Sequence, residues 1–399
     1  MFGSYLKFPK KRFIMISEVS GENLKKRFDD VLRTTVRVLR DCSVENGAIV
    51  AANTDMDYYP KDASPYRFVW IRDAAYVCVA ADILEERGVA SLRIQKKFFK
   101  WCLERPQSFS GASAENGAVF SQRYHTNGVR EGWQLQPDQT GTLLWALWHH
   151  FRKNLVQAQE FETLIRRAAN GICKIWGGKH FTTSTFDLWE ERATFPDTKD
   201  NHTYSLAACS KGLMCASELA EGSGYAKAEE VKKWRKCALE MESAALASYS
   251  ANEGYFLRTS GLLDDDTVDA SLLGLVYPFE LLSAGDERMV NTVRKMEEKI
   301  VRGGGVYRYE KDFYDGWVRD GSLRSKGAGA WPLLNFWMSI YYSVKGDAVS
   351  AEKYYTWVLR RVDGYIPEQI FENELQKSVY PLAWAHAMFV LASHFLTLL

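Results

Sequence analysis

The chain has 399 residues, of which 46% are hydrophobic, and its 51 basic and 50 acidic side chains leave a formal net charge of +1. Such a near balance of mixed charges gives no electrostatic footprint for nucleic acid or an anionic membrane, so neither is an expected partner. The sequence also lacks a stretch of about 18 uncharged apolar residues, which argues against a membrane-spanning segment.

The N-terminal region predicts a short extension, residues 1–20, ahead of the first helix. Its apolar run, residues 13–16, is shorter than the roughly 7–15 residues of a signal-peptide core, and no small-residue cleavage site follows it. We therefore expect a cytoplasmic protein.

Helical periodicity runs along most of the remaining chain. Apolar residues at helical spacing, with breaks at glycine and proline, predict twelve helices. Strand-like runs are few and short, at residues 13–16, 47–50 and 255–257. The predicted helices span about residues 21–43, 72–87, 89–105, 138–153, 156–177, 201–220, 224–249, 268–282, 286–301, 329–345, 347–362 and 379–398.

Twelve helices with few strands favour an all-α fold, an (α/α)6 barrel in which six inner helices lie inside six outer ones. No linker, composition shift or fixed-period repeat marks a second unit, so residues 1–399 are predicted to form one barrel domain. Its longer loops are expected to meet at one end of the barrel and to carry the function. These loops are residues 51–70, 106–137, 178–200, 302–328 and 363–378.

The cysteines and histidines predict neither a disulfide framework nor a metal site. The seven cysteines form an odd, dispersed set without a Cys-x-x-Cys spacing, which favours reduced, buried thiols. The seven histidines show no zinc-binding spacing. His149, His150 and His386 lie in apolar helical stretches and are expected to be satisfied core residues. We expect no cofactor and no metal.

An acidic pair in the third of these loops is the first candidate for chemistry. Glu190 follows Trp189 and precedes Glu191, and both an apolar wall and a like charge raise the pKa of a carboxyl group. A general acid that works near neutral pH needs such a shift. Glu368 follows Pro367 in the last loop, and hydrolysis of a glycosidic bond uses two carboxyl groups of this kind. Alone, however, an acidic pair is more often a solvated helix end.

Further motifs stand in a fixed order around these two residues. They are residues 66–73, 133–135 with 138–141, 305–309 with Asp312, Trp331, 367–369 and 381–384. From about residue 47 to the C-terminus, this ordered set resembles the glucoamylase-like glycoside hydrolases of family 15, which are inverting exo-α-glucosidases of glucoamylase, glucodextranase and trehalase type. The resemblance implies the same (α/α)6 barrel.

The resemblance also implies roles for single residues. Glu190 matches the general acid, Glu368 the general base that deprotonates water, and Tyr66 a tyrosine that helps to position this water. Arg72 and Asp73 match a pair that hydrogen-bonds the hydroxyls of the terminal sugar, and their position also suits the start of a helix, with Asp73 as a cap. Glu191 and Arg308 match further substrate-binding residues.

Of the 13 tryptophans, six lie inside helical patterns and are best explained as packing residues: Trp101, Trp145, Trp148, Trp234, Trp337 and Trp357. Four others fall in or beside the motif loops. Sugars present apolar C–H faces that stack on aromatic rings, so tryptophans in the motif loops are expected to line a sugar site. The four are Trp70, Trp133, Trp189 and Trp331. Residues 204–205 and 269–271 are expected to support the site from behind.

The resemblance therefore implies an enzyme that releases glucose, with inversion, from the non-reducing ends of short α-1,4- or α-1,6-linked gluco-oligosaccharides. The chain shows neither the N-terminal β-sandwich nor the starch-binding module of many members, which favours short substrates. Residues 315–321 lengthen the usual spacing and are expected to reshape the site beyond the first sugar. Alternatives are a trehalase, a phosphorolytic enzyme, a non-catalytic sugar-sensing barrel and a helical scaffold.

Overall fold

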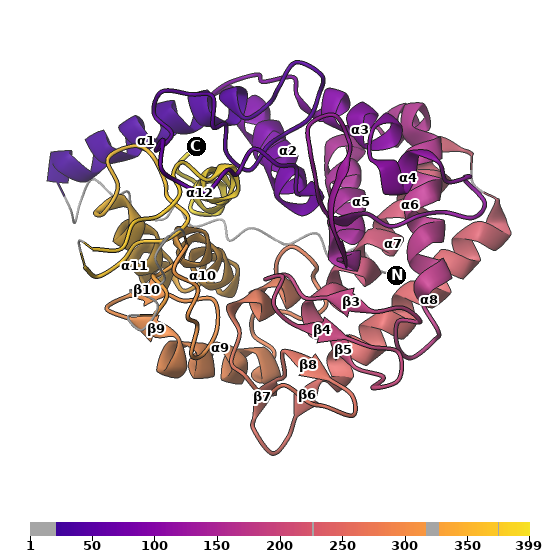
Figure 1. Ribbon diagram of the computed structural model, residues 1–399. Coiled ribbons are helices and arrows are strands. Elements are labelled where there is room, and N and C mark those ends of the chain that lie inside the picture. Colours follow the sequence, from indigo (N-terminus) through magenta and orange to yellow (C-terminus); the bar gives the residue numbers. More distant parts are fainter. Residues whose placement is uncertain (1–20, 226, 317–326, 374) are drawn as a thin grey trace.

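The computed structural model describes residues 21–225, 227–316, 327–373 and 375–399, and its helices form two concentric layers (Figure 1). Neighbours in the inner layer contact one another in chain order, and the last contacts the first, so the ring closes. This arrangement confirms the predicted (α/α)6 barrel. The inner ring consists of α2 (Ile71–Glu86), α5 (Pro137–Phe151), α7 (Thr203–Ser223), the 3-10 helix η2 (Ala270–Leu275), α10 (Pro332–Lys345) and α12 (Ala383–Phe395).

The outer layer alternates with the inner one along the chain. Its helices are α1 (Gly21–Asp41), α3 (Gln95–Glu104), α6 (Glu162–Ile175), α8 (Ala228–Ala247), α9 (Glu287–Lys299) and α11 (Ala348–Leu359). The outer helices α1, α6 and α9 are amphipathic, with one buried and one exposed side. By contrast, α2 is buried on all sides from Ile71 to Leu84, because it lies between the outer helices and its inner neighbours.

The inner helices α5 and α7 cross at two glycines. A Cβ atom on Gly141 would lie 2.3 Å from the Ala208 carbonyl oxygen, and one on Gly212 would lie 2.6 Å from the Gly141 carbonyl oxygen. Both distances are below any van der Waals contact, so a side chain at either position would force the two backbones apart.

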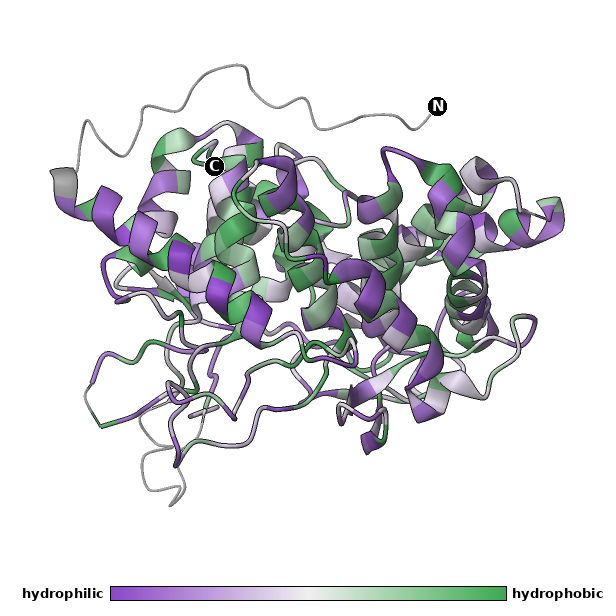
Figure 2. Ribbon diagram, turned by 90° about the horizontal axis from the view of Figure 1, so that it is seen from above, coloured by the Kyte–Doolittle hydropathy of each residue, from purple (hydrophilic) through white to green (hydrophobic). Residues whose placement is uncertain are grey.

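The strands of the described residues pair in twos, are antiparallel and lie in the connecting loops. The pairs are β1 (Ser121–Tyr124) with β2 (Arg130–Leu135), β3 (Thr185–Phe186) with β4 (Ala193–Thr194), β5 (Asn201–His202) with β8 (Thr259–Ser260), β6 (Tyr249–Ser250) with β7 (Tyr255–Phe256), and β9 (Val301–Arg302) with β10 (Gly305–Val306). In the view from above, long loops lie together on one side of the helical layers (Figure 2). The β1–β2 hairpin and the short helix α4 (Gln107–Ser110) were not predicted.

Most predicted helices are confirmed to within a few residues, and the main error concerns the fourth inner position. The helix predicted over 268–282 is wrong, because only the 3-10 helix η2 forms there. Pro278 lacks an N–H group and its ring clashes with the preceding turn, so a helix cannot continue through it. Gly274 also packs closely on Tyr204, since a Cβ atom would lie 2.9 Å from that ring.

Three smaller differences have local causes. The helix predicted from residue 89 begins only at Gln95, because Arg93 adopts a left-handed backbone conformation with φ of 55°. The segment 156–177 divides into the 3-10 helix η1 (Leu155–Phe161) and α6. The strand predicted over 47–50 forms only an isolated bridge between Ser43 and Ile49, whereas β7 confirms 255–257. The run 13–16 lies outside the described residues.

The inner helices begin where the motif loops end. Trp70 precedes α2, Gln136 precedes α5, Asp269 caps η2 and Trp331 precedes α10. The N-terminal end of a helix carries a partial positive charge, which favours carboxylates nearby. Within the described ranges, no helix is both long and apolar enough to cross a membrane.

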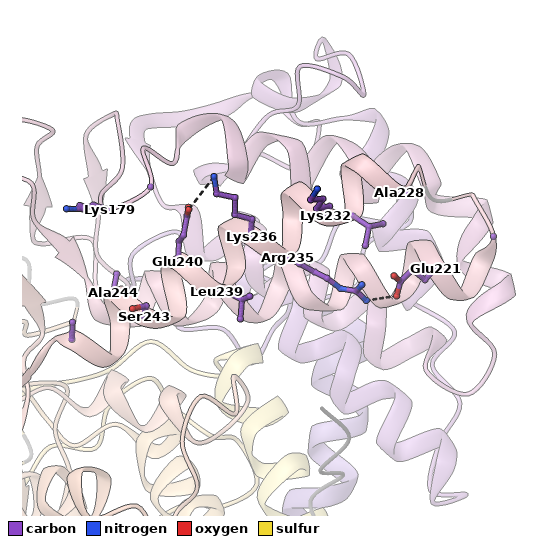
Figure 3. Close-up of a pocket in the computed structure, with 14 residues that line it drawn as sticks. Lys179, Glu221, Ala228, Lys232, Arg235, Lys236, Leu239, Glu240, Ser243 and Ala244 are labelled. Atoms are coloured by element: carbon purple, nitrogen blue, oxygen red, sulfur yellow. Dashed lines mark hydrogen bonds and ion pairs between the residues drawn. The ribbon is translucent and has the colours of Figure 1, made fainter. Parts of the chain in front are cut away.

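The seven cysteines are all buried and free, as predicted, and the predicted core histidines have partners. His149 and His150 both contact the Asp82 carboxylate, at 3.0 and 2.7 Å. The outer side of α8 carries a groove that also includes Lys179 and Glu221 (Figure 3). None of the predicted site residues lines this groove.

Candidate active site

Glu190 lies in a constrained turn between β3 and β4. It adopts a left-handed conformation with φ of 66°, and its backbone N–H donates to the Asp187 carbonyl oxygen at 3.1 Å. Asp187 Oδ1 then accepts the backbone N–H groups of Glu191 (2.9 Å) and Arg192 (3.0 Å). A non-glycine residue is uncommon in this backbone region, and such strain persists only where surrounding contacts hold it. The turn therefore fixes the direction of the Glu190 side chain.

Two donors hold the Glu190 carboxyl group. The indole Nε1–H of Trp70 donates to one oxygen, and the side-chain amide of Gln122 donates to the other. Burial raises the pKa of Glu190, although these hydrogen bonds and nearby Arg72 act in the opposite direction. Gln122 was not predicted, because a single glutamine in an unrecognised hairpin gives no signal in the sequence.

The Glu191 carboxylate has partners of its own. It accepts from Arg308 Nη2 at 2.8 Å and from the hydroxyl of Tyr309, so its charge is partnered elsewhere. Arg308 in turn makes two contacts of 2.8 Å with Asp312. The predicted binding residues Glu191 and Arg308 are thus joined in one ion-pair cluster.

Aromatic rings surround the Arg308 guanidinium. Its central carbon lies 4.7 Å from the ring centroid of Tyr314, 5.0 Å from Trp331 and 5.4 Å from Trp189. The rings of Trp189 and Trp331 are 5.7 Å apart. Cation–π contacts of this kind hold a guanidinium in place while its N–H groups stay directed at carboxylates. Two of the four predicted tryptophans therefore lie directly at Arg308.

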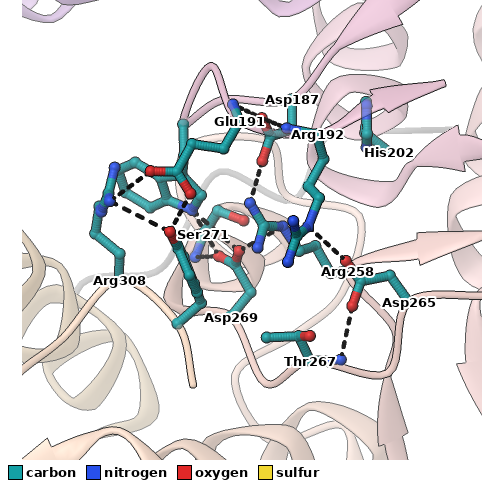
Figure 4. Close-up of polar contacts among 12 residues, drawn as sticks. Asp187, Glu191, Arg192, His202, Arg258, Asp265, Thr267, Asp269, Ser271 and Arg308 are labelled. Carbon is teal, nitrogen blue, oxygen red and sulfur yellow. Dashed lines mark hydrogen bonds and ion pairs between the residues drawn. The ribbon is translucent and has the colours of Figure 1, made fainter. Parts of the chain in front are cut away.

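A buried network anchors the acid-bearing turn from behind (Figure 4). Arg258 donates to Asp187 and lies 3.2 Å from Asp269, whose carboxylate accepts Trp189 Nε1–H at 3.0 Å. Burial acts to raise the pKa of Asp187, but the charges of Arg258 and His202 outweigh it and lower this pKa. Asp269 was expected to support the site, whereas Arg258 was missed because only its place after the strand-like run 255–257 marks it.

Glu368 is buried, with 4% of its surface exposed, in the loop between α11 and α12. Tyr66 Oη donates to its Oε1 at 3.0 Å, and the hydroxyl of Tyr314 lies 2.5 Å from that of Tyr66. Oε2 is buried and has no hydrogen-bond partner among the described residues. Burial raises the pKa of Glu368 to about 7, although the hydrogen bond from Tyr66 opposes the shift. Tyr314 directly precedes the segment 315–321 and was not predicted as a site residue.

The predicted acid and base are linked through two aromatic side chains. Tyr66 contacts Glu368 and Trp70 contacts Glu190, and the two rings lie 5.8 Å apart. The structure thus brings four predicted residues together from three loops. Glu368 comes from the loop between α11 and α12, Tyr66 and Trp70 come from the loop before α2, and Glu190 comes from the β3–β4 turn.

Arg72 and Asp73 lie buried at the start of α2. Arg72 contacts Asp138 Oδ2 at 2.9 Å and Asp73 Oδ1 at 3.2 Å, and its guanidinium lies 5.2 Å from the ring centroid of Trp384. Burial raises the pKa of Asp73 to about 6, against the effect of Arg72. The expectation that Asp73 caps this helix is wrong, because the helix begins at Ile71 after Trp70 and Asp73 lies within its first turn.

Trp133 lies apart from this cluster. It is 66% exposed on β2, and its ring contacts Phe186 edge-on at 5.2 Å. Of the segment 315–321, only Asp315 and Gly316 are described, and a Cβ atom on Gly316 would lie 3.6 Å from Glu368 Oε2. The described part of the chain contains no group of three or more histidine, cysteine or acidic residues that could hold a metal ion.

An (α/α)6 barrel that presents one buried and one partly buried glutamate, both hydrogen-bonded, among arginines and tryptophans has the architecture of a glycoside hydrolase. The family model for glycosyl hydrolases family 15 matches residues 37–394, and the chain belongs to this family.

Curated relatives and solved structures resemble the chain over most of its length. An uncharacterized glycosyl hydrolase of Methanocaldococcus jannaschii is 29% identical over 90% of this chain and 54% of its own length. Trehalase 2 of Sulfolobus acidocaldarius is 28% identical over 62% of this chain and 43% of its own. The chain thus spans about half the length of these curated relatives.

Among solved structures, a wild-type glycosidase aligns with a TM-score of 0.74 at 20% identity, over 94% of this chain and 98% of its own. A bacterial glucoamylase in complex with acarbose aligns with a TM-score of 0.70 at 22% identity, over 94% of this chain and 56% of its own. At these identities, the likeness concerns the fold.

Proposed function

We propose that this chain hydrolyses the terminal α-glucosidic bond of short gluco-oligosaccharides by a single displacement that inverts the anomeric carbon. Glu368 carries this proposal, because Tyr66 holds one of its oxygens while the other is buried without a hydrogen bond in the described residues, with only the amide of Gln369 nearby. A buried acceptor without a donor is costly, so a water molecule that donates to it is the natural complement. That water is the proposed nucleophile.

Glu190 is the proposed acid that protonates the leaving oxygen. The indole N–H of Trp70 can only donate, so the Glu190 oxygen that it contacts must accept. The proton that Glu190 transfers therefore belongs on its other oxygen, beside Gln122. An amide side chain can either donate or accept after reorientation, so Gln122 suits both the protonated and the ionised acid. In the proposed reaction, this proton passes to the leaving oxygen while a proton of the attacking water passes to Glu368.

The terminal sugar is proposed to bind above Arg72 and Asp73. The two side chains offer N–H donors and carboxylate acceptors in one place, which suits neighbouring hydroxyl groups. Both are nearly buried at the start of α2, with Asp138 and Trp384 behind Arg72. A site that these residues close at one end admits the end of a sugar chain and does not let a polymer pass through. A phosphorolytic reaction is disfavoured, because it needs a phosphate site where Glu368 lies.

We predict that glucose is the only early product from a linear α-1,4-linked heptasaccharide, because the proposed site accepts only chain ends. The measurement is chromatography of products over the first few per cent of conversion. The same assay on maltose, isomaltose and trehalose assigns the linkage, since the relatives include both Trehalase 2 and an isomaltose glucohydrolase of Kribbella flavida. Trehalose as the best substrate would establish the second candidate, a trehalase. Maltose or maltotriose before glucose would contradict exo-action, and inactivity on every α-glucoside would favour a sugar-sensing barrel.

We also predict that the glucose released from the non-reducing end of maltose appears first as the β-anomer. A single displacement by water inverts the α-linkage and needs the two carboxyl groups roughly 6.5–9.5 Å apart, to leave room for the water. Proton NMR in the first minutes distinguishes the anomers before they equilibrate. If α-glucose appears first, the reaction is retaining, and Glu368 is not the base of a single displacement.

A further inference from the structure

Outer helices α6 and α8 run parallel and are joined by a ladder of contacts at a constant sequence offset. Arg166 contacts Glu230 at 2.5 Å, and Trp234 Nε1–H donates to Asn170 at 2.8 Å. After the next turns, Trp176 Nε1–H donates to Glu240 at 3.0 Å. Each pair is separated by 64 residues, so the two helices keep one register over three turns.

Cys173 and Cys237 form a fourth pair at the same offset of 64 residues. They lie between the Asn170–Trp234 and Trp176–Glu240 pairs, on the faces that the two helices turn toward each other. The interaction between the two thiols raises the pKa of Cys173 and lowers that of Cys237. Two neighbouring thiols, one of which has a lowered pKa, are the arrangement in which a disulfide forms.

These two cysteines are also the least buried of the seven. Cys173 and Cys237 are 6% and 8% exposed, whereas the other five are 0–2% exposed. Lys233 and Lys236 help to lower the pKa of Cys237, and Lys236 and Glu240 border the open groove along α8 (Figure 3). With the largest exposed fraction of the seven, Cys237 is the cysteine that a small oxidant reaches first.

We propose that Cys173 and Cys237 form a reversible disulfide when the folded protein meets a peroxide, and that this bond locks α6 to α8. The Cys237 thiolate attacks a peroxide oxygen, the O–O bond breaks, and a sulfenic acid and one water result after proton uptake. The Cys173 thiol then attacks the sulfenic sulfur, the S–S bond forms, and the hydroxyl group leaves as water with the Cys173 proton. Two thiols and one hydrogen peroxide thus give one disulfide and two waters.

The proposed bond has a consequence for the acid-bearing loop. The covalent ring that it closes contains the chain from the end of α6 to the middle of α8, and therefore β3, β4 and Glu190 with its turn. A cross-link lowers the entropy of the unfolded chain and opposes local opening of the enclosed segment. The proposal does not depend on the proposed hydrolase activity.

The test treats the folded wild-type chain with hydrogen peroxide, removes the oxidant, and counts thiols after denaturation. We expect the count to fall from seven to five and to return to seven with dithiothreitol. Peptide mapping without reductant should join the peptides that contain Cys173 and Cys237, and the oxidised protein should unfold several degrees higher than the reduced one.

Matched variants identify the partners. Cys237→Ser and Cys173→Ser should each retain all six remaining thiols, or gain oxygen on the single cysteine, without a cross-link. Cys209→Ala is the control, because Cys209 lies on α7 near Cys173 and is the alternative partner. The Cys209→Ala variant should still lose two thiols. Seven thiols after treatment of the wild type, a cross-link to another cysteine, or a disulfide without higher thermal stability would each overturn the proposal.

Discussion

Replacement of Glu368 by glutamine is expected to lower kcat about 100- to 10,000-fold on the best natural substrate, because the attacking water loses its proton acceptor. Glutamine has nearly the same shape and can still accept the hydroxyl of Tyr66, so the fold should persist. The measurement is initial-rate glucose release, with circular dichroism to compare the folded states. Glu372→Gln is the matched control, since Glu372 is an exposed carboxylate in the same loop and should leave the rate near the wild-type value.

The pH profile tests the same assignment by a second observable. A base must be ionised, and the raised pKa of about 7 places the acid limb of kcat/KM near this value, well above the ordinary 4.5 of a glutamate. Activity should therefore fall about tenfold for each pH unit below this limb, and the limb should disappear in Glu368→Gln. A wild-type limb near 4.5, or a Glu368→Gln variant with near wild-type activity, would show that Glu368 is not the base.

The barrel could be predicted from the sequence because its inner helices are apolar on all sides and its outer helices on one side. The periodicity of each helix is local information, as the close agreement at α2, α5 and α10 illustrates. The helix predicted over 268–282 was wrong because the apolar run was given more importance than Pro278, which ends a helix. The close packing of Gly274 on Tyr204 is a long-range contact that the sequence does not show. The β1–β2 hairpin was missed because its residues alternate poorly and β2 is largely exposed.

The site could be predicted only where motifs marked it. The family resemblance marks Glu190, Glu368, Tyr66 and Trp70. The structure adds a contact between Trp70 and Glu190, 120 residues apart, and one between Tyr66 and Glu368, 302 residues apart. Such long-range contacts leave no periodic or local trace. Gln122, Arg258 and Tyr314 were missed for this reason, since each acts through a residue far away in the chain.

The electrostatic argument for Glu190 was right in direction and incomplete in cause. Burial does raise its pKa, as expected from an apolar environment, but the donors Trp70 and Gln122 oppose that shift. Glu191 was expected to raise the pKa as a like charge, whereas its carboxylate is partnered by Arg308 and Tyr309. The effect of a neighbouring charge on a pKa depends on the direction in which each side chain points. Adjacency in the sequence does not reveal this direction.

Replacement of Glu190 by glutamine is expected to lower the rate about 100- to 10,000-fold on natural disaccharides, because their leaving oxygen departs only with a proton. An aryl glucoside with an acidic phenol needs little protonation, so the same variant should recover much of its rate on that substrate, while Glu368→Gln should not. Asp197→Asn, an exposed carboxylate in the loop after β4, is the control and should behave as wild type on both substrates. The comparison separates the two roles, since the acid acts on the leaving group and the base on water. If Glu190→Gln loses the same factor in rate on both substrates, Glu190 does not donate the proton. The hydrogen bond from the Gln122 amide would then be a purely structural contact.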